Sequence, residues 1–299
     1  MKNMRIPLLI AWGVAILGII LGSFLDFNIS SAIASPKNVV GLAISAIGPT
    51  IGFGAVAVMG GGFLALIIKG DYHIALKVLF GVLAACCLGV AIYYPGGEYF
   101  GVNGFYGAAP SWVGYLIVII PEGAAMAAGY FIFKDCQNKN MWIIFVAMIV
   151  TLCIALLAVI PILKGIMHRP RYRIVSTTDV EFHNWWEPCK NYKELMQLYG
   201  IESSDHFKSY PSGHTAEASI MFFAAVFFPL ANNGFKKYQM PLFIGASVLV
   251  VLVAFARILA AAHYLSDVST GAFVMLSLLL IANEIIARLK PLQLEEEVA

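Results

Sequence analysis

Three ionisable residues interrupt the apolar stretch FARILAAAHYLSD: Arg257, His263 and Asp267. His263 and Asp267 are four residues apart, so on a helix the carboxylate can hold one ring nitrogen and leave the other as nucleophile or base. Arg257 and His263 are six apart, about 240° around the axis of one continuous helix. The chain is therefore expected to break between them, with Arg257 ending one helix and His263 leading into the next.

Two further polar stretches, LKGIMHRPRYR and KSYPSGHTAE, carry related residues: Lys164, Arg171, Ser212, Gly213 and His214. Together with Arg257, the first two supply a cluster of positive donors that suits a dianionic oxyanion such as phosphate. Ser212 and Gly213 directly precede an apolar run, so backbone N–H groups at a helix N-terminus would point at the same anion. These residue types favour a phosphate site.

The elements that position these residues are membrane helices. The chain has 299 residues, of which 60% are hydrophobic and 12% charged, against roughly 25% charged in a soluble domain. Eight apolar runs are long enough to cross a bilayer: 6–25, 45–68, 74–94, 113–133, 141–163, 215–231, 241–259 and 269–287. They lack the alternation of barrel strands, so we expect an all-α polytopic bundle forming one integral membrane domain, 1–299. The first run resembles a signal peptide, but its length favours an uncleaved anchor.

The distribution of Lys and Arg predicts the orientation. With a cytoplasmic N-terminus, ten basic residues lie on the inner side: Lys2, Arg5, Lys69, Lys77, Lys134, Lys139, Lys236, Lys237, Arg288 and Lys290. The outer loops after the first and third runs carry only Lys37, as expected for a cell-membrane protein with both termini in the cytoplasm. The other eight lie outside, against this preference: Lys164, Arg169, Arg171, Arg173, Lys190, Lys193, Lys208 and Arg257. We therefore expect them to have another role.

All three polar stretches reach this outer surface, because the one long polar segment, the loop 164–214, joins the fifth and sixth runs there. They are expected to form one site. The sequence has no basic run or aromatic ladder typical of nucleic-acid binding, and its five cysteines show no zinc spacing.

On these residues the chain resembles the type 2 phosphatidic acid phosphatase superfamily of membrane lipid phosphatases, whose active site is related to that of vanadium haloperoxidases. The family motifs are K-x(6)-R-P, P-S-G-H and S-R-x(5)-H-x(3)-D. Residues 164–267 match them at Lys164 and Arg171, at PSGH, and at Arg257, His263 and Asp267. Tyr172 stands in place of Pro and Ala256 in place of Ser, so no ionisable group is lost, although Tyr172 alters how the loop approaches phosphate. The common family core has six spans, two fewer than expected here.

The resemblance implies a mechanism without a metal or other cofactor. His263 attacks phosphorus and forms a phosphohistidine, while Asp267 orients the ring. His214 protonates the leaving alkoxide and then activates water. The phosphate oxygens are held by Lys164, Arg171, Ser212, Gly213 and Arg257.

Three residues beside the motifs are candidates for a supporting or headgroup role. Glu217 lies three residues after His214, where it either influences that histidine or complements the helix N-terminus. Arg169, in the outer loop, either contacts a lipid headgroup or is simply solvated. Tyr172 lies beside Arg171.

Three functions remain open. The first is a phosphatase acting on a membrane lipid phosphate or pyrophosphate at the extracytoplasmic face, with phosphatidic acid, phosphatidylglycerol phosphate and polyprenyl pyrophosphate as candidate substrates. The second is a phosphotransferase that passes the same phosphoryl group to another lipid or sugar. The third is a lipid or anion transporter whose basic cluster only binds.

Overall fold

The computed structural model describes residues 2–99, 110–136, 138 and 140–288. This part of the chain has eight apolar helical segments long enough to span a membrane, which confirms the expected all-α bundle. Four are single helices that come first in the chain: α1 (Lys2–Ile33), α2 (Val39–Lys69), α3 (Ile74–Glu98) and α4 (Ser111–Phe133). The fifth consists of α5 (Met141–Cys153), the π-helical η1 (Ile154–Val159) and α6 (Ile160–Met167). The last three are α9 (Gly213–Ala218) with α10 (Ile220–Ala231), α11 (Gln239–Leu259) and α12 (Leu265–Arg288).

Several helices extend beyond the apolar runs. α1 continues past the expected end at residue 25 to Ile33, because no Pro or Gly occurs between residue 25 and Pro36. Lys164 lies on the last turn of α6 rather than in a loop, and α12 begins at Leu265 rather than at 269, with Asp267 in its first turn. These extra turns carry the polar residues that hydropathy leaves outside a span.

The central helix of the bundle is α2, which packs against α3, α4, α9, α10 and α11. Small residues permit this close packing. A Cβ on Gly61 would lie 1.9 Å from the Met126 carbonyl oxygen of α4, so only glycine fits there. α1 packs on the other side of the bundle, against α12 and α11.

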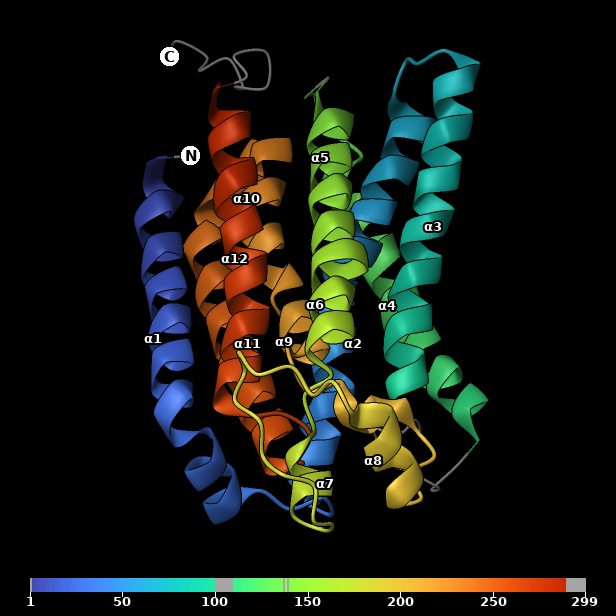
Figure 1. Cartoon of the computed structure of the whole chain (residues 1–299). Helices are drawn as coiled ribbons and strands as arrows, with labels where there is room; N and C mark the ends of the chain where they lie inside the picture. Colours follow the sequence, from blue (N-terminus) through green and yellow to red (C-terminus); the bar gives the residue numbers. More distant parts are fainter. Residues whose placement is uncertain (1, 100–109, 137, 139, 289–299) are drawn as a thin grey trace.

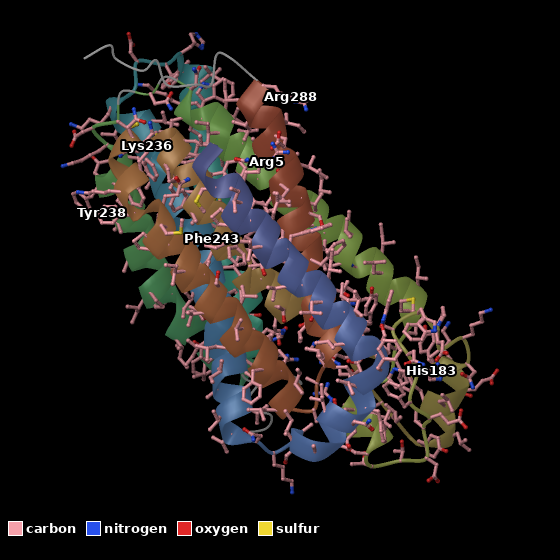
Figure 2. The ribbon with its side chains drawn as sticks, turned by 90° about the vertical axis from the view of Figure 1, so that its left-hand side faces the viewer. Arg5, His183, Lys236, Tyr238, Phe243 and Arg288 are labelled. Atoms are coloured by element: carbon pink, nitrogen blue, oxygen red, sulfur yellow. The ribbon has the colours of Figure 1, made fainter. Side chains whose placement is uncertain are left out.

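The two ends of the bundle differ in character. Figure 1 shows the N-terminus and the end of α12 at one end, with the short helices α7 (Tyr172–Val175) and α8 (Tyr192–Leu198) at the other. In Figure 2, Arg5, Lys236 and Arg288 lie at the first end and His183 at the second. The polar segment after α6 therefore covers one end of the bundle.

This segment is folded onto the bundle. Its own small core consists of Ile174, Val180, Cys189 and Phe207. Arg171 donates its main-chain N–H to the His206 carbonyl at 2.9 Å, and Ser209 donates to the Arg169 carbonyl at 3.0 Å. Residues 169–171 and 206–209 are thereby held side by side at this end of the bundle.

Candidate active site

The chain breaks between Arg257 and His263, as their spacing predicts. α11 ends at Leu259, Ala261 adopts a left-handed φ of 55°, and α12 starts at Leu265. The Arg257 carbonyl accepts main-chain hydrogen bonds from Ala262 (3.1 Å) and His263 (3.2 Å). The tight turn brings both side chains, each fully buried, into the same region.

The His263 ring has one bound and one open nitrogen. Its Nδ1 lies 2.6 Å from the Ser209 carbonyl oxygen, which can only accept, so Nδ1 carries the proton and Nε2 keeps its lone pair. Nε2 is buried and has no hydrogen-bond partner within the described residues. Burial lowers the pKa of the His263 imidazole well below its ordinary 6.5, and the charges of Arg171, Arg257 and Lys164 lower it further. At neutral pH the ring is therefore uncharged and has a free lone pair on Nε2.

Asp267 is connected to this ring indirectly, through Ser209. Its Oδ2 lies 3.8 Å from His263 Nδ1, longer than a hydrogen bond, whereas the direct contact expected from the spacing would be shorter. The same Oδ2 accepts from the Ser209 hydroxyl at 2.5 Å and from the Tyr264 N–H at 2.9 Å. Asp267 therefore fixes the residue whose carbonyl holds the ring.

The three sequence-predicted cations come from three elements and meet around His263. Lys164 lies on α6, Arg171 follows it in the polar segment, and Arg257 lies on α11. Each interacts electrostatically with His263 and with the other two. Arg171 is buried and donates through Nε to the Asp205 carbonyl (2.8 Å) and through its terminal nitrogen to Oδ1 of that carboxylate (3.0 Å). The concentration of positive charge, with Arg171 and Arg257 buried and Lys164 partly exposed, is suited to an anion.

The residues Ser212 to His214 form the turn that enters α9. The Ser212 N–H donates to the Asp267 carbonyl at 2.9 Å, which ties this turn to α12. The approach requires glycine on the facing helix, because a Cβ on Gly271 would lie 2.4 Å from the Ser212 carbonyl oxygen. Lys164 Nζ lies 3.6 Å from where a Cβ of Gly213 would stand, so Gly213 leaves open space beside this cation.

His214 has a carboxylate partner. Its Nε2 lies 3.3 Å from Oε2 of Glu98, the last residue of α3. Glu98 also interacts electrostatically with Arg257 and Arg171, so it lies among the cations. Glu217 faces the same region, with Oε1 3.8 Å from the Cβ position of Gly213. Two carboxylates therefore accompany the predicted proton donor.

A family model decides how this arrangement is classified. The model described as PAP2 superfamily matches residues 140–290, just over half of the chain. This chain belongs to the PAP2 superfamily. Neither the curated proteins nor the solved structures gave a match. The PAP2 segment begins with α5, so it contains Lys164, Arg171, PSGH, Arg257, His263 and Asp267, whereas α1 to α4 lie outside it.

Of the two supporting residues in the polar segment, Arg169 is neither the solvated nor the headgroup-contacting residue that the sequence leaves open. It is fully buried and donates to Asp267 Oδ1 at 2.6 Å and to Asp26 Oδ2 at 2.9 Å. Tyr172 packs edge-on against Tyr264 and Phe27. Both belong to the packing around the PAP2 site rather than to a solvated loop surface.

Three carboxylates of this PAP2 site were missed by the sequence argument: Asp26, Glu98 and Asp205. Asp205 pairs with Arg171 and Arg173. Burial raises the pKa of Asp205, but these two guanidiniums outweigh it and hold the pKa well below its usual range. For Asp26 and Glu98, the available signal was an acidic residue at the outer end of an apolar run, as in FLDFN and GGEYF.

The described residues contain no group of three or more His, Cys, Asp or Glu side chains arranged to hold a metal ion.

Proposed function

We propose that this PAP2 superfamily protein is a membrane lipid phosphatase that hydrolyses a lipid phosphate monoester or pyrophosphate through a phosphohistidine on His263. The observation that carries the proposal is the open, buried Nε2 of His263 among Lys164, Arg171 and Arg257. A neutral nucleophile facing three cations is suited to attack on a phosphorus atom whose oxygens carry the negative charge.

In the first step, the His263 Nε2 lone pair forms an N–P bond while the P–O bond to the leaving group breaks. Lys164, Arg171, Arg257, the Ser212 hydroxyl and the Gly213 N–H hold the phosphoryl oxygens. His214 gives its proton to the departing alkoxide. The positive charge that develops on the ring as Nε2 donates its lone pair is shared with Nδ1, which keeps its proton and donates it to the Ser209 carbonyl.

In the second step, His214 takes a proton from water, and the hydroxide attacks phosphorus. The N–P bond breaks, its electron pair returns to Nε2, and inorganic phosphate leaves. The Glu98 carboxylate, 3.3 Å from His214 Nε2, supports the protonated imidazole that each step uses or forms.

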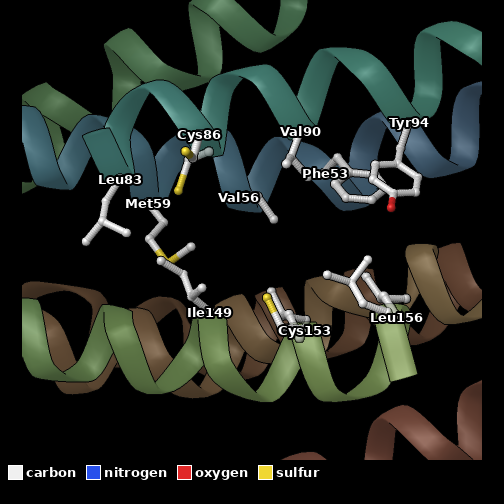
Figure 3. A pocket seen from close by; sticks show the side chains of 13 residues that line it. Phe53, Val56, Met59, Leu83, Cys86, Val90, Tyr94, Ile149, Cys153 and Leu156 are labelled. Carbon is white, nitrogen blue, oxygen red and sulfur yellow. The ribbon is translucent and has the colours of Figure 1, made fainter. Parts of the chain in front are cut away.

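An apolar groove next to the site supports a lipid as substrate (Figure 3). It has a volume of about 230 Å³ and lies between α3 and the fifth span, with α2 at its floor. Leu83 and Tyr94 mark its two ends on α3, about 16 Å apart at the helical rise. Tyr94 is one turn before Glu98, which contacts His214. A hydrocarbon chain in this groove would therefore have its phosphate end at the site.

The fifth span also widens along this groove. Leu156 and Leu157, which line it, belong to the π-helical η1, and π-helical turns are frequent at functional sites. Pro161 lies just beyond and has no N–H for a regular helical bond to Leu157, which accounts locally for the irregular turn.

The direct test is phosphate release by purified protein from lipid phosphates and pyrophosphates of several chain lengths, with and without vanadate. We expect release that vanadate inhibits. Transfer of the phosphoryl group to an added alcohol acceptor in place of phosphate release would indicate the phosphotransferase, and lipid binding with neither release nor transfer would indicate the transporter.

The groove gives a sharper prediction. Val90→Trp should fill it and displace at least two substrate methylenes, which costs about 1.6 kcal/mol, or more than tenfold in kcat/KM. A short-chain phosphate should be hydrolysed as by the unsubstituted protein. The matched control is Val82→Trp, since Val82 is exposed on the same helix and does not line the groove. An equal loss for short and long chains would refute the chain-binding role.

We also propose that the site faces the extracytoplasmic side, since the expected inner basic residues such as Arg5, Lys236 and Arg288 gather at the opposite end (Figure 2). In intact cells, a membrane-impermeant maleimide should label Lys190→Cys above the background of the native cysteines and should not label Lys236→Cys. The reverse pattern would invert the assignment.

A further inference from the structure

A buried ion-pair network links the first helix to the site. Asp26, on α1, is 2% exposed. Its Oδ2 accepts from an Arg169 terminal nitrogen at 2.9 Å, and its Oδ1 accepts from the Ser266 N–H at 2.9 Å. The Ser266 hydroxyl is also hydrogen-bonded to Asp26. The other terminal nitrogen of Arg169 donates to Asp267 Oδ1 at 2.6 Å, so one guanidinium holds two carboxylates.

The orientation of Arg169 is determined on every side. Its Nε donates to the His183 carbonyl at 2.8 Å, and the terminal nitrogen that binds Asp267 also donates to the Ser266 hydroxyl at 2.8 Å. The guanidinium carbon lies 4.2 Å from the centre of the Tyr264 ring. With Asp26 bound to one terminal nitrogen, only the other terminal nitrogen is available to Asp267.

We propose that Asp26 is a positioning residue for the active site, acting through Arg169 and Asp267 on the Ser209 carbonyl that holds His263. The links are Asp26 to Arg169, Arg169 to Asp267, Asp267 to the Ser209 hydroxyl, and the Ser209 carbonyl to His263 Nδ1. α1 lies outside the segment matched by the PAP2 model, so the chain adds this carboxylate from beyond its family segment.

Asp26 would position Asp267 because the two carboxylates share the one guanidinium of Arg169. Without the Asp26 charge, Arg169 is free to turn both terminal nitrogens towards Asp267, since arginine favours bidentate pairing with a carboxylate. Asp267 would then move away from Ser209 and Tyr264, and the His263 ring would lose its fixed orientation. A nucleophile displaced in this way attacks more slowly although the phosphate still binds.

The test is Asp26→Asn, which keeps the shape and an acceptor for Ser266 and removes the charge. We expect kcat and the rate of phosphoenzyme formation to fall about 10- to 100-fold, as for outer partners that orient a reactive group. KM and the inhibition constant of vanadate should stay within about threefold, and Asp26→Glu should recover part of kcat. Because Arg169 transmits the effect, combining Asp26→Asn with Arg169→Lys should cost little more than the worse single change.

The matched control is Glu284→Gln. Glu284 pairs with Arg5 at 3.6 Å and so also joins α12 to α1, but at the other end of the bundle. If Asp26 only ties α1 to the bundle, both changes should lower thermal stability in detergent and leave kcat per folded molecule unchanged, and that result would overturn the proposal. Fully multiplicative effects of the Asp26 and Arg169 changes would also overturn it.

The inference rests on the proposed phosphatase function, and the two fail differently. If the unsubstituted protein releases no phosphate from any lipid phosphate, the proposed function fails and the role of Asp26 falls with it. An active unsubstituted protein whose Asp26→Asn variant keeps its full kcat would refute the positioning role alone.

Discussion

Replacing His263 with alanine should reduce phosphate release from lipid phosphates by on the order of 10³-fold or more, because the N–P bond can no longer form. The variant should still fold, since His263 contributes one hydrogen bond, to a carbonyl at the end of the polar segment. After brief reaction with a ³²P-labelled substrate, denatured wild-type protein should carry an acid-labile, alkali-stable label. The His263→Ala protein should carry none.

The control for this experiment is His183→Ala. His183 lies in the polar segment and accepts a hydrogen bond from Arg169 through its main-chain carbonyl, which the substitution leaves in place. This variant should retain activity and label. Full activity of His263→Ala, or label that persists in it, would contradict the phosphohistidine mechanism.

His214→Asn should lower kcat for an alkyl lipid phosphate by about 10² to 10⁴, the usual contribution of a positioned acid or base. The fall in the rate of the first step should be much smaller for an aryl phosphate, because a phenolate leaves without being protonated. Hydrolysis of the phosphohistidine still needs a base, so the aryl substrate should give a burst followed by slow turnover. Stopped-flow absorbance measures both phases.

The comparison between the two leaving groups makes this result specific to His214. His263→Ala should be inactive on both substrates and show no burst. If His214→Asn loses the same factor in the first step on alkyl and aryl phosphates, then His214 serves in binding or packing and is not the proton donor.

The sequence was most informative where covalent spacing determines the result. Eight apolar runs predict eight helices, because backbone N–H and C=O groups left unpaired in hydrocarbon are costly and a helix pairs them within the segment. The six-residue gap between Arg257 and His263 predicts a turn, because on one continuous helix the two side chains would lie on different faces. α11 and α12 are separated there. Hydropathy fails at the helix ends, as at α1, where the polar Asp26 lies beyond the apolar run and still within the helix.

The partners of the charged residues could not be predicted in the same way. The cations Lys164, Arg171 and Arg257 were predicted from their motifs, but Asp205 and Glu98 pair with site residues from distant positions. Pairing of this kind depends on which helix ends lie together. The acceptor for His263 was equally hidden, because it is the main-chain carbonyl of Ser209, and every residue has such a group.

The junction between the Ser212 turn and α12 has a consequence for motion. The main-chain hydrogen bond from Ser212 to Asp267 and the close approach at Gly271 tie the Ser212 turn to the first turns of α12. In the proposed mechanism, closing around a substrate would therefore come from elements outside this junction. Lys164 and Glu98 are both partly exposed, and they lie on the fifth span and on α3, the two elements that form the sides of the groove. In the proposed mechanism, adjustment to different lipids would thus fall to Lys164, which holds phosphate, and to Glu98, which supports His214, while the His263 ring keeps its position.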